Sequence, residues 1–129
     1  MSGRYLLDTN IIIALFANDI RVLQTLAVAK EVIVSTIVLG ELYYDARNSQ
    51  RVAENLAVIE QLRMAIVVLP CDALVATSYG ELKLDLKKAG TPLPENDIWI
   101  AATARTHNLI LVSQDQHFAS IKPLTLEIW

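Results

Sequence analysis

The chain has 129 residues, of which 53% are hydrophobic and 19% are charged, and its formal net charge is −3. This length predicts a single domain, residues 1–129, with a real hydrophobic core, and the composition excludes an intrinsically disordered chain. Nucleic-acid readers usually carry a basic excess, so 11 Lys and Arg against 14 Asp and Glu argue against a DNA repressor or coat protein. A nuclease with an acidic site remains compatible with this charge.

The cysteine content and the apolar runs indicate the compartment. Cys71 has no partner for an intrachain disulfide and cannot form a thiolate zinc cluster. No apolar run approaches the ~20 residues that cross a bilayer. A carboxylate as early as Asp8 argues against a secretory signal. The sequence therefore predicts a cytoplasmic protein with no membrane segment.

Short apolar runs alternate along the chain with segments of helical spacing. Continuous apolar runs bounded by turn residues are typical of strands buried on both faces of a parallel sheet. The runs predict strands at 5–7, 32–34, 66–69, 109–112 and 124–128. Helices are predicted at 9–17, from the cap Asp19, from Ser35 or Thr36 to Asn48, from Ser49, from the cap Asp72 to Ala89 before Gly90, and at 97–106. This alternation predicts a three-layer α/β/α sandwich around a mostly parallel sheet.

Two acids follow predicted strands directly. Asp8 comes after the first strand, and Asp115 comes just after the fourth. Each has an ordinary structural explanation, because Asp8 can cap the next helix and Asp115 can form a turn. However, open α/β sheets bind their ligands at the carboxyl edge of the strands. The shared position of these two acids therefore predicts a site at that edge.

Two further acids lie near the starts of predicted helices. Glu41 is the only charged residue from Thr36 to Tyr44, and apolar neighbours on nearly every side predict that it is largely buried. Burying a carboxylate is costly unless a cation or hydrogen-bond donors compensate. Gly40 beside it suggests a close approach of another backbone, and a helix that faces solvent across a narrow stripe is the alternative. Asp97 is placed in the first turn of its helix with Asn96 as the cap, where the helix dipole alone would explain it.

All four acids can approach one edge of the sheet. Their oxygen ligands would select hard cations such as Mg²⁺ or Mn²⁺, which orient a phosphodiester and activate a water. Zinc fits poorly, because His107 and His117 lack a zinc-binding spacing. Both histidines are interpreted as surface residues, with His117 as a candidate substrate contact. The large aromatic residues are interpreted as core or interface residues, namely Trp99, Tyr43, Tyr44 and Tyr79.

Four blocks of the sequence resemble those of the PIN-domain nucleases, and in particular those of the bacterial VapC-like toxins. The blocks lie in the order of the family and are Leu7–Asn10, Ser35–Leu42, Asn96–Ala102 and Leu111–Phe118. They span nearly the whole chain, from residue 5 to 118. Each block is unspecific by itself, and the four together carry the resemblance.

The resemblance implies an endoribonuclease that depends on Mg²⁺ or Mn²⁺ and cuts single-stranded RNA or an exposed RNA loop. The catalytic, metal-binding quartet of the family falls on Asp8, Glu41, Asp97 and Asp115. Asn10 and Ser113 are expected to support these acids, and Ser113 stands where the family usually has Thr. VapC-like proteins also imply a homodimer and a small cognate antitoxin, VapB-like, that inserts a peptide at the active site.

Two alternative functions stay open at this point. Asp8-Thr9-Asn10 is compatible with the aspartyl-phosphate nucleophile of a phosphoryl-transfer domain, although a haloacid-dehalogenase-like pattern has a second Asp where Asn10 stands. That alternative leaves Glu41 unexplained. The other is a non-catalytic interaction domain of the same fold, in which the acids serve as helix caps.

Overall fold

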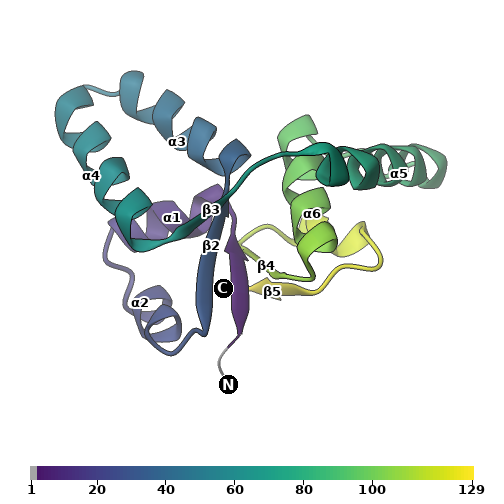
Figure 1. Cartoon of the computed structure of the whole chain (residues 1–129), viewed down its shortest axis with the longest axis horizontal. Helices are drawn as coiled ribbons and strands as arrows, with labels where there is room; N and C mark the ends of the chain where they lie inside the picture. The colour runs from purple at the N-terminus through teal and green to yellow at the C-terminus, as the bar shows by residue number, and fades with distance from the viewer. Residues whose placement is uncertain (1–2) are drawn as a thin grey trace.

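The computed structural model describes residues 3–129 and alternates strands with helices. Figure 1 shows the elements in chain order. They are β1 (Arg4–Leu7), α1 (Thr9–Phe16), α2 (Ile20–Ala27), β2 (Glu31–Ser35), α3 (Thr36–Arg47), α4 (Val52–Ala65), β3 (Val67–Leu69), α5 (Ala73–Ala89), α6 (Glu95–His107), β4 (Ile110–Ser113), the 3-10 helix η1 (Gln116–Ser120) and β5 (Leu126–Ile128).

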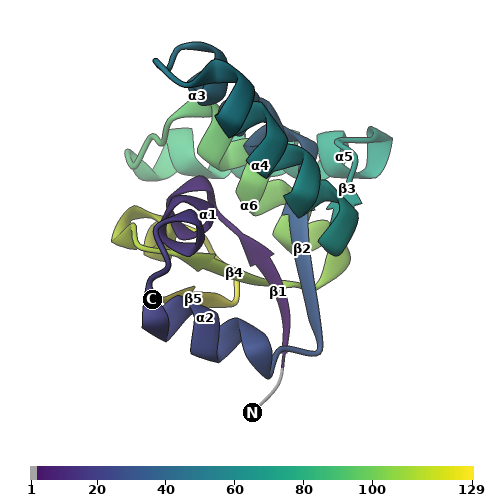
Figure 2. The ribbon, with the colours of Figure 1, turned by 90° about the vertical axis from the view of Figure 1, so that its left-hand side faces the viewer.

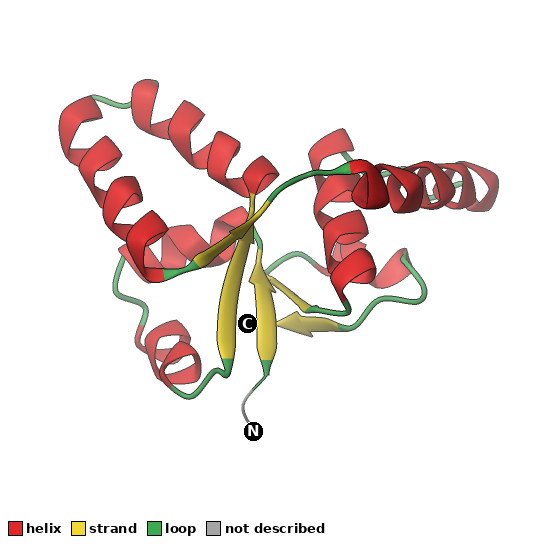
Figure 3. Ribbon diagram, viewed as in Figure 1, coloured by secondary structure: helices red, strands yellow, loops and turns green. Residues whose placement is uncertain are grey.

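The strands form one sheet in the order β3-β2-β1-β4-β5, and every neighbouring pair is parallel. In the central strand, Leu6 is paired with Ile33 on one side and Leu111 on the other. Helices α1 to α4 cover one face of the sheet and α5 and α6 the other (Figures 1 and 3). Figure 2 looks onto the first of these faces, with α1, α2 and α4 in front of the strands. The predicted three-layer parallel sandwich is confirmed.

The central strands are apolar on both faces because helices cover both. Leu6, Leu7, Leu111 and Val112 are completely buried, whichever way their side chains point. A sheet with one face in water would instead show alternating polar residues. The continuous apolar runs in the sequence are therefore a direct consequence of the two helical layers.

Several helices begin at the caps that the sequence predicts. The side chains of Asp19, Ser35 and Asp72 each accept a hydrogen bond from a backbone N–H in the first turn of α2, α3 and α5. These bonds satisfy donors that the helix itself leaves free. At the other end of α5, Gly90 has a left-handed backbone with φ of 71°, so the predicted stop is also confirmed.

Two helix starts differ from the prediction. Helix α4 begins at Val52 rather than Ser49, because the Ser49 hydroxyl donates to the carbonyl of Ala46 and holds Ser49 in the preceding turn. Helix α6 begins at Glu95, with Pro94 at the N-cap. The fixed φ of proline suits a helix start, and the Pro94 carbonyl accepts the N–H of Asp97 at 3.1 Å. Asn96 therefore lies inside the first turn and is not the cap.

In the residues that the structure describes, no single helix is long and apolar enough to cross a membrane. Helices α1 and α2 taken together have the length and composition of a membrane span, but they are bent by 106° relative to each other.

The left-handed cap of α5 gives the first testable prediction. We expect Gly90→Ala to lower the free energy of unfolding by about 1–2 kcal/mol, because an L side chain is strained at this φ. Gly80 lies inside the same helix with open space around its added Cβ, so Gly80→Ala is expected to raise that free energy by about 0.5–1 kcal/mol. Urea unfolding of both variants measures the difference. Effects of the same sign would contradict the prediction.

Candidate active site

Asp8 ends β1 and begins α1 at the carboxyl edge of the sheet. Its backbone N–H donates to the Val112 carbonyl at 2.9 Å, which continues the pairing of β1 with β4. Its side chain is only 6% exposed. One carboxylate oxygen accepts the Thr9 N–H at 2.8 Å, and the other accepts the Ser113 hydroxyl at 2.7 Å. A carboxylate oxygen can accept more than one bond, so Asp8 serves as a helix cap and still has lone pairs for a ligand.

Ser113 and Asn10 link the end of β4 to the start of α1. The Ser113 oxygen accepts hydrogen bonds from the Asn10 amide at 3.3 Å and from the Asp115 N–H at 3.0 Å. The Asn10 oxygen accepts the Gln114 N–H at 3.1 Å. Together with the bond to Asp8, these contacts fix where the acid of β1 lies relative to the loop after β4. The structure thus places both residues beside the acids, and their supporting role stays a prediction.

This network gives a prediction for stability. We expect Ser113→Ala to lower the free energy of unfolding by about 1–3 kcal/mol, because it removes the donor to a buried carboxylate and the acceptor of a backbone N–H. Ser120 is a matched control, since its exposed hydroxyl donates to the backbone near the same turn. Ser120→Ala is expected to change stability by less than about 0.5 kcal/mol. Chemical denaturation measures both, and equal effects would contradict the role given to Ser113.

Glu41 faces the same edge from α3. Its Oε1 accepts the Thr9 hydroxyl at 2.8 Å, so it is tied to the residue beside Asp8. Glu41 is partly rather than fully buried, because the neighbouring Gly40, Tyr44 and Asp45 are exposed and give α3 an open side. The suggested close approach at Gly40 is wrong. Apart from its own stretch of helix, no atom lies within 4 Å of a Cβ added there.

Asp97 and Asp115 are connected through a histidine. The Asp97 Oδ2 lies 2.9 Å from the His117 Nε2, and the His117 Nδ1 lies 3.0 Å from the Asp115 Oδ1. Asp97 is in the first turn of α6, and His117 is in η1, just after β4. This role of His117 was not expected from the sequence. Its position two residues after Asp115, in the turn at the strand end, is the signal that could have indicated it.

The electrostatics of Asp97 show how close the acids are. Its pKa is raised above the ordinary value, first by burial and next by the negative charge of Asp8, with a further contribution from Glu41. His117 acts in the opposite direction. The structure thus brings Asp8, Glu41 and Asp97 together from three elements, and Asp115 joins them through His117.

The residues fit a hard divalent cation by their chemistry. The donor set consists of carboxylate oxygens, which Mg²⁺ and Mn²⁺ prefer, and a cation would relieve the repulsion at Asp97. Within residues 3–129, however, no three His, Cys, Asp or Glu side chains are already arranged as ligands of one ion. Asp8, Glu41 and Asp97 are instead in contact with Ser113, Thr9 and His117 respectively.

An open cavity of about 540 Å³ lies beside the acids. Most of its lining comes from one side of α3, and the rest from the starts of α1 and α6. Its lining includes Thr9, Gly40, Glu41, Tyr44, Asp45 and Asn96. The cavity therefore gives an extended ligand access to Glu41. We call it the acid-side cavity.

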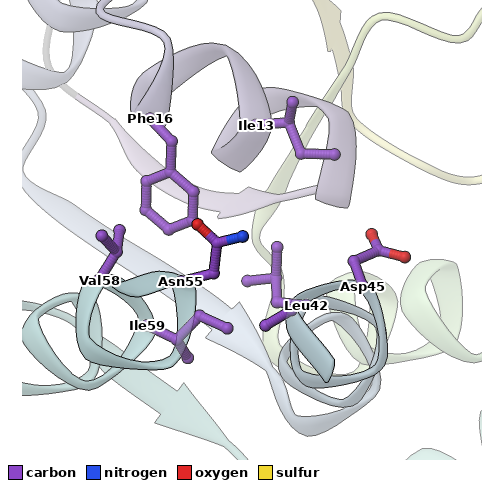
Figure 4. Close-up of a pocket in the computed structure, with 8 residues that line it drawn as sticks. Ile13, Phe16, Leu42, Asp45, Asn55, Val58 and Ile59 are labelled. Atoms are coloured by element: carbon purple, nitrogen blue, oxygen red, sulfur yellow. The ribbon is translucent and has the colours of Figure 1, made fainter. Parts of the chain in front are cut away.

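A second hollow of about 310 Å³ lies between α1, α3 and α4. Figure 4 shows Phe16 pointing from α1 towards Val58 of α4, with Leu42 of α3 at the side. Ile13, Phe16 and Val58 are exposed although they are large and apolar. Asp45 lines this apolar hollow and the acid-side cavity alike, so the two are adjacent.

The sequence of the chain matches a known protein family and several of its members. The chain matches the PIN domain over residues 5–123. It is 38% identical over 131 residues to Ribonuclease VapC2 of Haemophilus influenzae, covering 98% of each chain. It is 36% identical over 130 residues to the tRNA(fMet)-specific endonuclease VapC of Shigella flexneri, again covering 98% of each chain.

The fold agrees with a solved structure at similar coverage. The crystal structure of VapBC2 from Rickettsia felis, bound to a DNA fragment from their promoter, contains a chain that superposes with a TM-score of 0.90. That chain is 30% identical, and the match covers 97% of this chain and 98% of the other. Family, sequence and fold thus agree along almost the whole length. The chain belongs to the PIN-domain family and, within it, to the VapC-like ribonucleases.

Proposed function

We propose that this chain is a metal-dependent endoribonuclease and the toxin of a toxin–antitoxin pair, acting in the cytoplasm. The observation that carries the proposal is the meeting of Asp8, Glu41 and Asp97 at the carboxyl edge of the sheet. It occurs in a chain whose relatives are named ribonucleases. Neither alternative function accounts for Glu41 beside Asp8 and Asp97.

Each acid has a separate part in this proposal. Asp8, Glu41 and Asp97 would hold Mg²⁺ or Mn²⁺ directly or through water, and Asp115 would complete the set or hold a second ion. When bound, such an ion activates a water for attack on the phosphodiester and offsets the charge that develops on the leaving oxygen.

The other residues position the acids. Asp8 is held by the Thr9 N–H and Ser113, so its location is fixed before any ligand arrives. The Thr9 hydroxyl orients Glu41. His117 keeps Asp97 and Asp115 side by side and reduces the repulsion around them. Fixing reacting groups in advance in this way lowers the entropic part of the barrier.

The direct test is cleavage of a single-stranded RNA in Mg²⁺ or Mn²⁺ against the same reaction in EDTA. We expect cleavage only with the metal, and we expect it to be lost in Glu41→Gln purified in the same way, which controls for contaminating nuclease. Equal cleavage in EDTA, or by Glu41→Gln, would overturn the proposal. A hydroxylamine-sensitive adduct on Asp8 after incubation with acetyl phosphate, without RNA cleavage, would favour the phosphoryl-transfer alternative.

The apolar hollow is our proposed docking site for an apolar segment of a VapB-like antitoxin. The Rickettsia felis relative was solved as VapBC2. In the isolated chain the apolar side chains of Ile13, Phe16 and Val58 are exposed to water. Burying such side chains against a partner favours association. A segment docked there would also reach the acid-side cavity, because Asp45 lines both.

Co-expression with a VapB-like antitoxin tests the docking site. We expect Phe16→Asp to abolish co-purification while RNA cleavage continues, since Phe16 is outside the acid cluster. Unchanged co-purification would overturn the assignment of this hollow.

We also propose a homodimer. Leu74 and Leu84 are exposed on α5, on the other face of the sheet from the apolar hollow, and a second copy could cover them. Sedimentation equilibrium of the isolated chain decides between dimer and monomer.

A further inference from the structure

Tyr44 differs from the other three tyrosines of the chain. The rings of Tyr5 and Tyr79 each pack against a tryptophan. The hydroxyl of Tyr43 donates a hydrogen bond to Glu60. The Tyr44 side chain has no ring contact and no hydrogen bond among residues 3–129, and it is 69% exposed. Of the two roles expected for this tyrosine, core or interface, its exposure excludes only the core.

The position of Tyr44 is more informative than its exposure, because single exposed apolar residues are common. Tyr44 lines the acid-side cavity one turn of α3 after Gly40 and three residues after Glu41. A Cβ added at Gly40 would meet no atom within 4 Å outside its own stretch of helix, so the surface of α3 one turn before Tyr44 is open. A flat ligand lying on Tyr44 would thus be next to the acids and not on a remote surface.

The charge of the protein limits how RNA can be held there. The chain has a formal net charge of −3, and both Glu41 and Asp45 line the cavity. Attraction between basic side chains and phosphates, which dominates most nucleic-acid binding, is therefore weak at this place. Stacking of a base on an aromatic ring is independent of the net charge, and every base has a face that can stack.

We infer that the exposed ring of Tyr44, three residues after Glu41 in the acid-side cavity, stacks on one unpaired base of the RNA and so positions the scissile phosphodiester at the acids. This inference rests on the proposed ribonuclease function and specifies how the substrate is held. Tyr44 is a positioning residue, since its ring contacts a base and not the reacting phosphate. Asn96 lines the same cavity from α6, and its side-chain amide is available to the edge of that base.

The test separates binding from chemistry in steady-state cleavage of a single-stranded RNA. We expect Tyr44→Ala to raise KM by about 5- to 150-fold, the change that corresponds to losing one base–aromatic stack, with kcat nearly unchanged. Tyr44→Phe and Tyr44→Trp keep a ring and are expected to retain the wild-type KM. Ile20→Ala is the matched control, because Ile20 has a similar exposed fraction of 66% but lies on α2. Its KM is expected to stay at the wild-type value.

A second measurement does not depend on cleavage. RNA carrying 2-aminopurine at one position at a time is titrated with protein in the Asp97→Asn background. We expect the fluorescence of 2-aminopurine to be quenched at one position by the protein with Tyr44 intact and by Tyr44→Trp. With Tyr44→Ala we expect no quenching at that position. Because this measures binding alone, it tests the stacking even if the wild-type protein fails to cut RNA and the proposed function is wrong.

Three results would overturn the inference. The first is a wild-type KM for Tyr44→Ala together with unchanged 2-aminopurine quenching. The second is a defect in Tyr44→Phe equal to that in Tyr44→Ala, which would show that the ring is not what binds. The third is a loss of antitoxin co-purification in Tyr44→Ala with normal RNA cleavage, which would assign this ring to a protein contact.

Discussion

Replacing Asp97 with Asn is expected to reduce the rate of metal-dependent RNA cleavage by about 10³-fold or more. A metal ion supplies several kcal/mol of transition-state stabilisation, and each 1.36 kcal/mol is about tenfold in rate. Asn has nearly the same shape and volume as Asp but no charge, so the substitution lowers the affinity for the metal ion without leaving a gap. Asp97 is half-buried and feels the charges of both Asp8 and Glu41, so its loss affects the centre of the cluster.

Asp97 is a better choice than Asp8 for this experiment. The Asp8 carboxylate accepts hydrogen bonds from both Thr9 and Ser113. In Asp8→Asn an NH₂ group would face the Ser113 oxygen, which already accepts two other donors. That variant is expected to lose activity and some stability together. Among residues 3–129 the Asp97 carboxylate has a single polar side-chain partner, His117, so Asp97→Asn separates the two effects better.

Asp85 provides the matched control for the cleavage assay. It is an exposed aspartate on α5 that is outside the acid cluster, and Asp85→Asn is expected to cut RNA at the wild-type rate. The rates are measured under single-turnover conditions, with circular dichroism to show that each variant is folded. A wild-type rate in Asp97→Asn would remove Asp97 from the catalytic site.

The sequence predicted the strands and the place of Asp8 for a physical reason. Burial on both faces requires continuous apolar runs, so each central strand is visible in the sequence, and the residue after it lies at the edge of the sheet. The family match confirms the fold and the ribonuclease class, whereas the roles of the four acids stay predictions. Ser113 was indicated by the family resemblance and not by the strand pattern, and the structure places it as the last residue of β4.

The features that the sequence did not predict depend on contacts between distant segments. The position of α6 decides how much of the α3 surface around Glu41 is covered. In the structure, Gly40, Tyr44 and Asp45 on that surface are open to solvent. An apolar run therefore suggested a buried helix where one side is in fact free. The contact of His117 with Asp97 depends on the packing of η1 near the start of α6. Neither spacing nor composition contains that information.

The last prediction concerns the stability of the acid cluster without metal. The pKa of Asp97 is raised above its ordinary value of 3.8, because burial and the charge of Asp8 together outweigh His117. A raised pKa in the folded state means that the folded protein binds this proton more tightly than the unfolded chain does. Ionised Asp97 therefore lowers the free energy of unfolding at neutral pH. As the pH falls through the raised pKa, the carboxyl takes up a proton and this loss of stability disappears.

Asp97→Asn, which has no carboxyl to ionise, is therefore expected to melt at a higher temperature than the wild type at neutral pH in EDTA. The difference should shrink as the pH is lowered, because the wild-type carboxyl then becomes neutral too. Mg²⁺ or Mn²⁺ should reverse the order, since an ion that binds only the folded state stabilises it and the wild type binds the ion more tightly. Thermal unfolding of both proteins, with Asp85→Asn as control, measures these shifts. A lower melting temperature for Asp97→Asn in EDTA at neutral pH would show that its attraction to His117 outweighs the repulsion from the other acids.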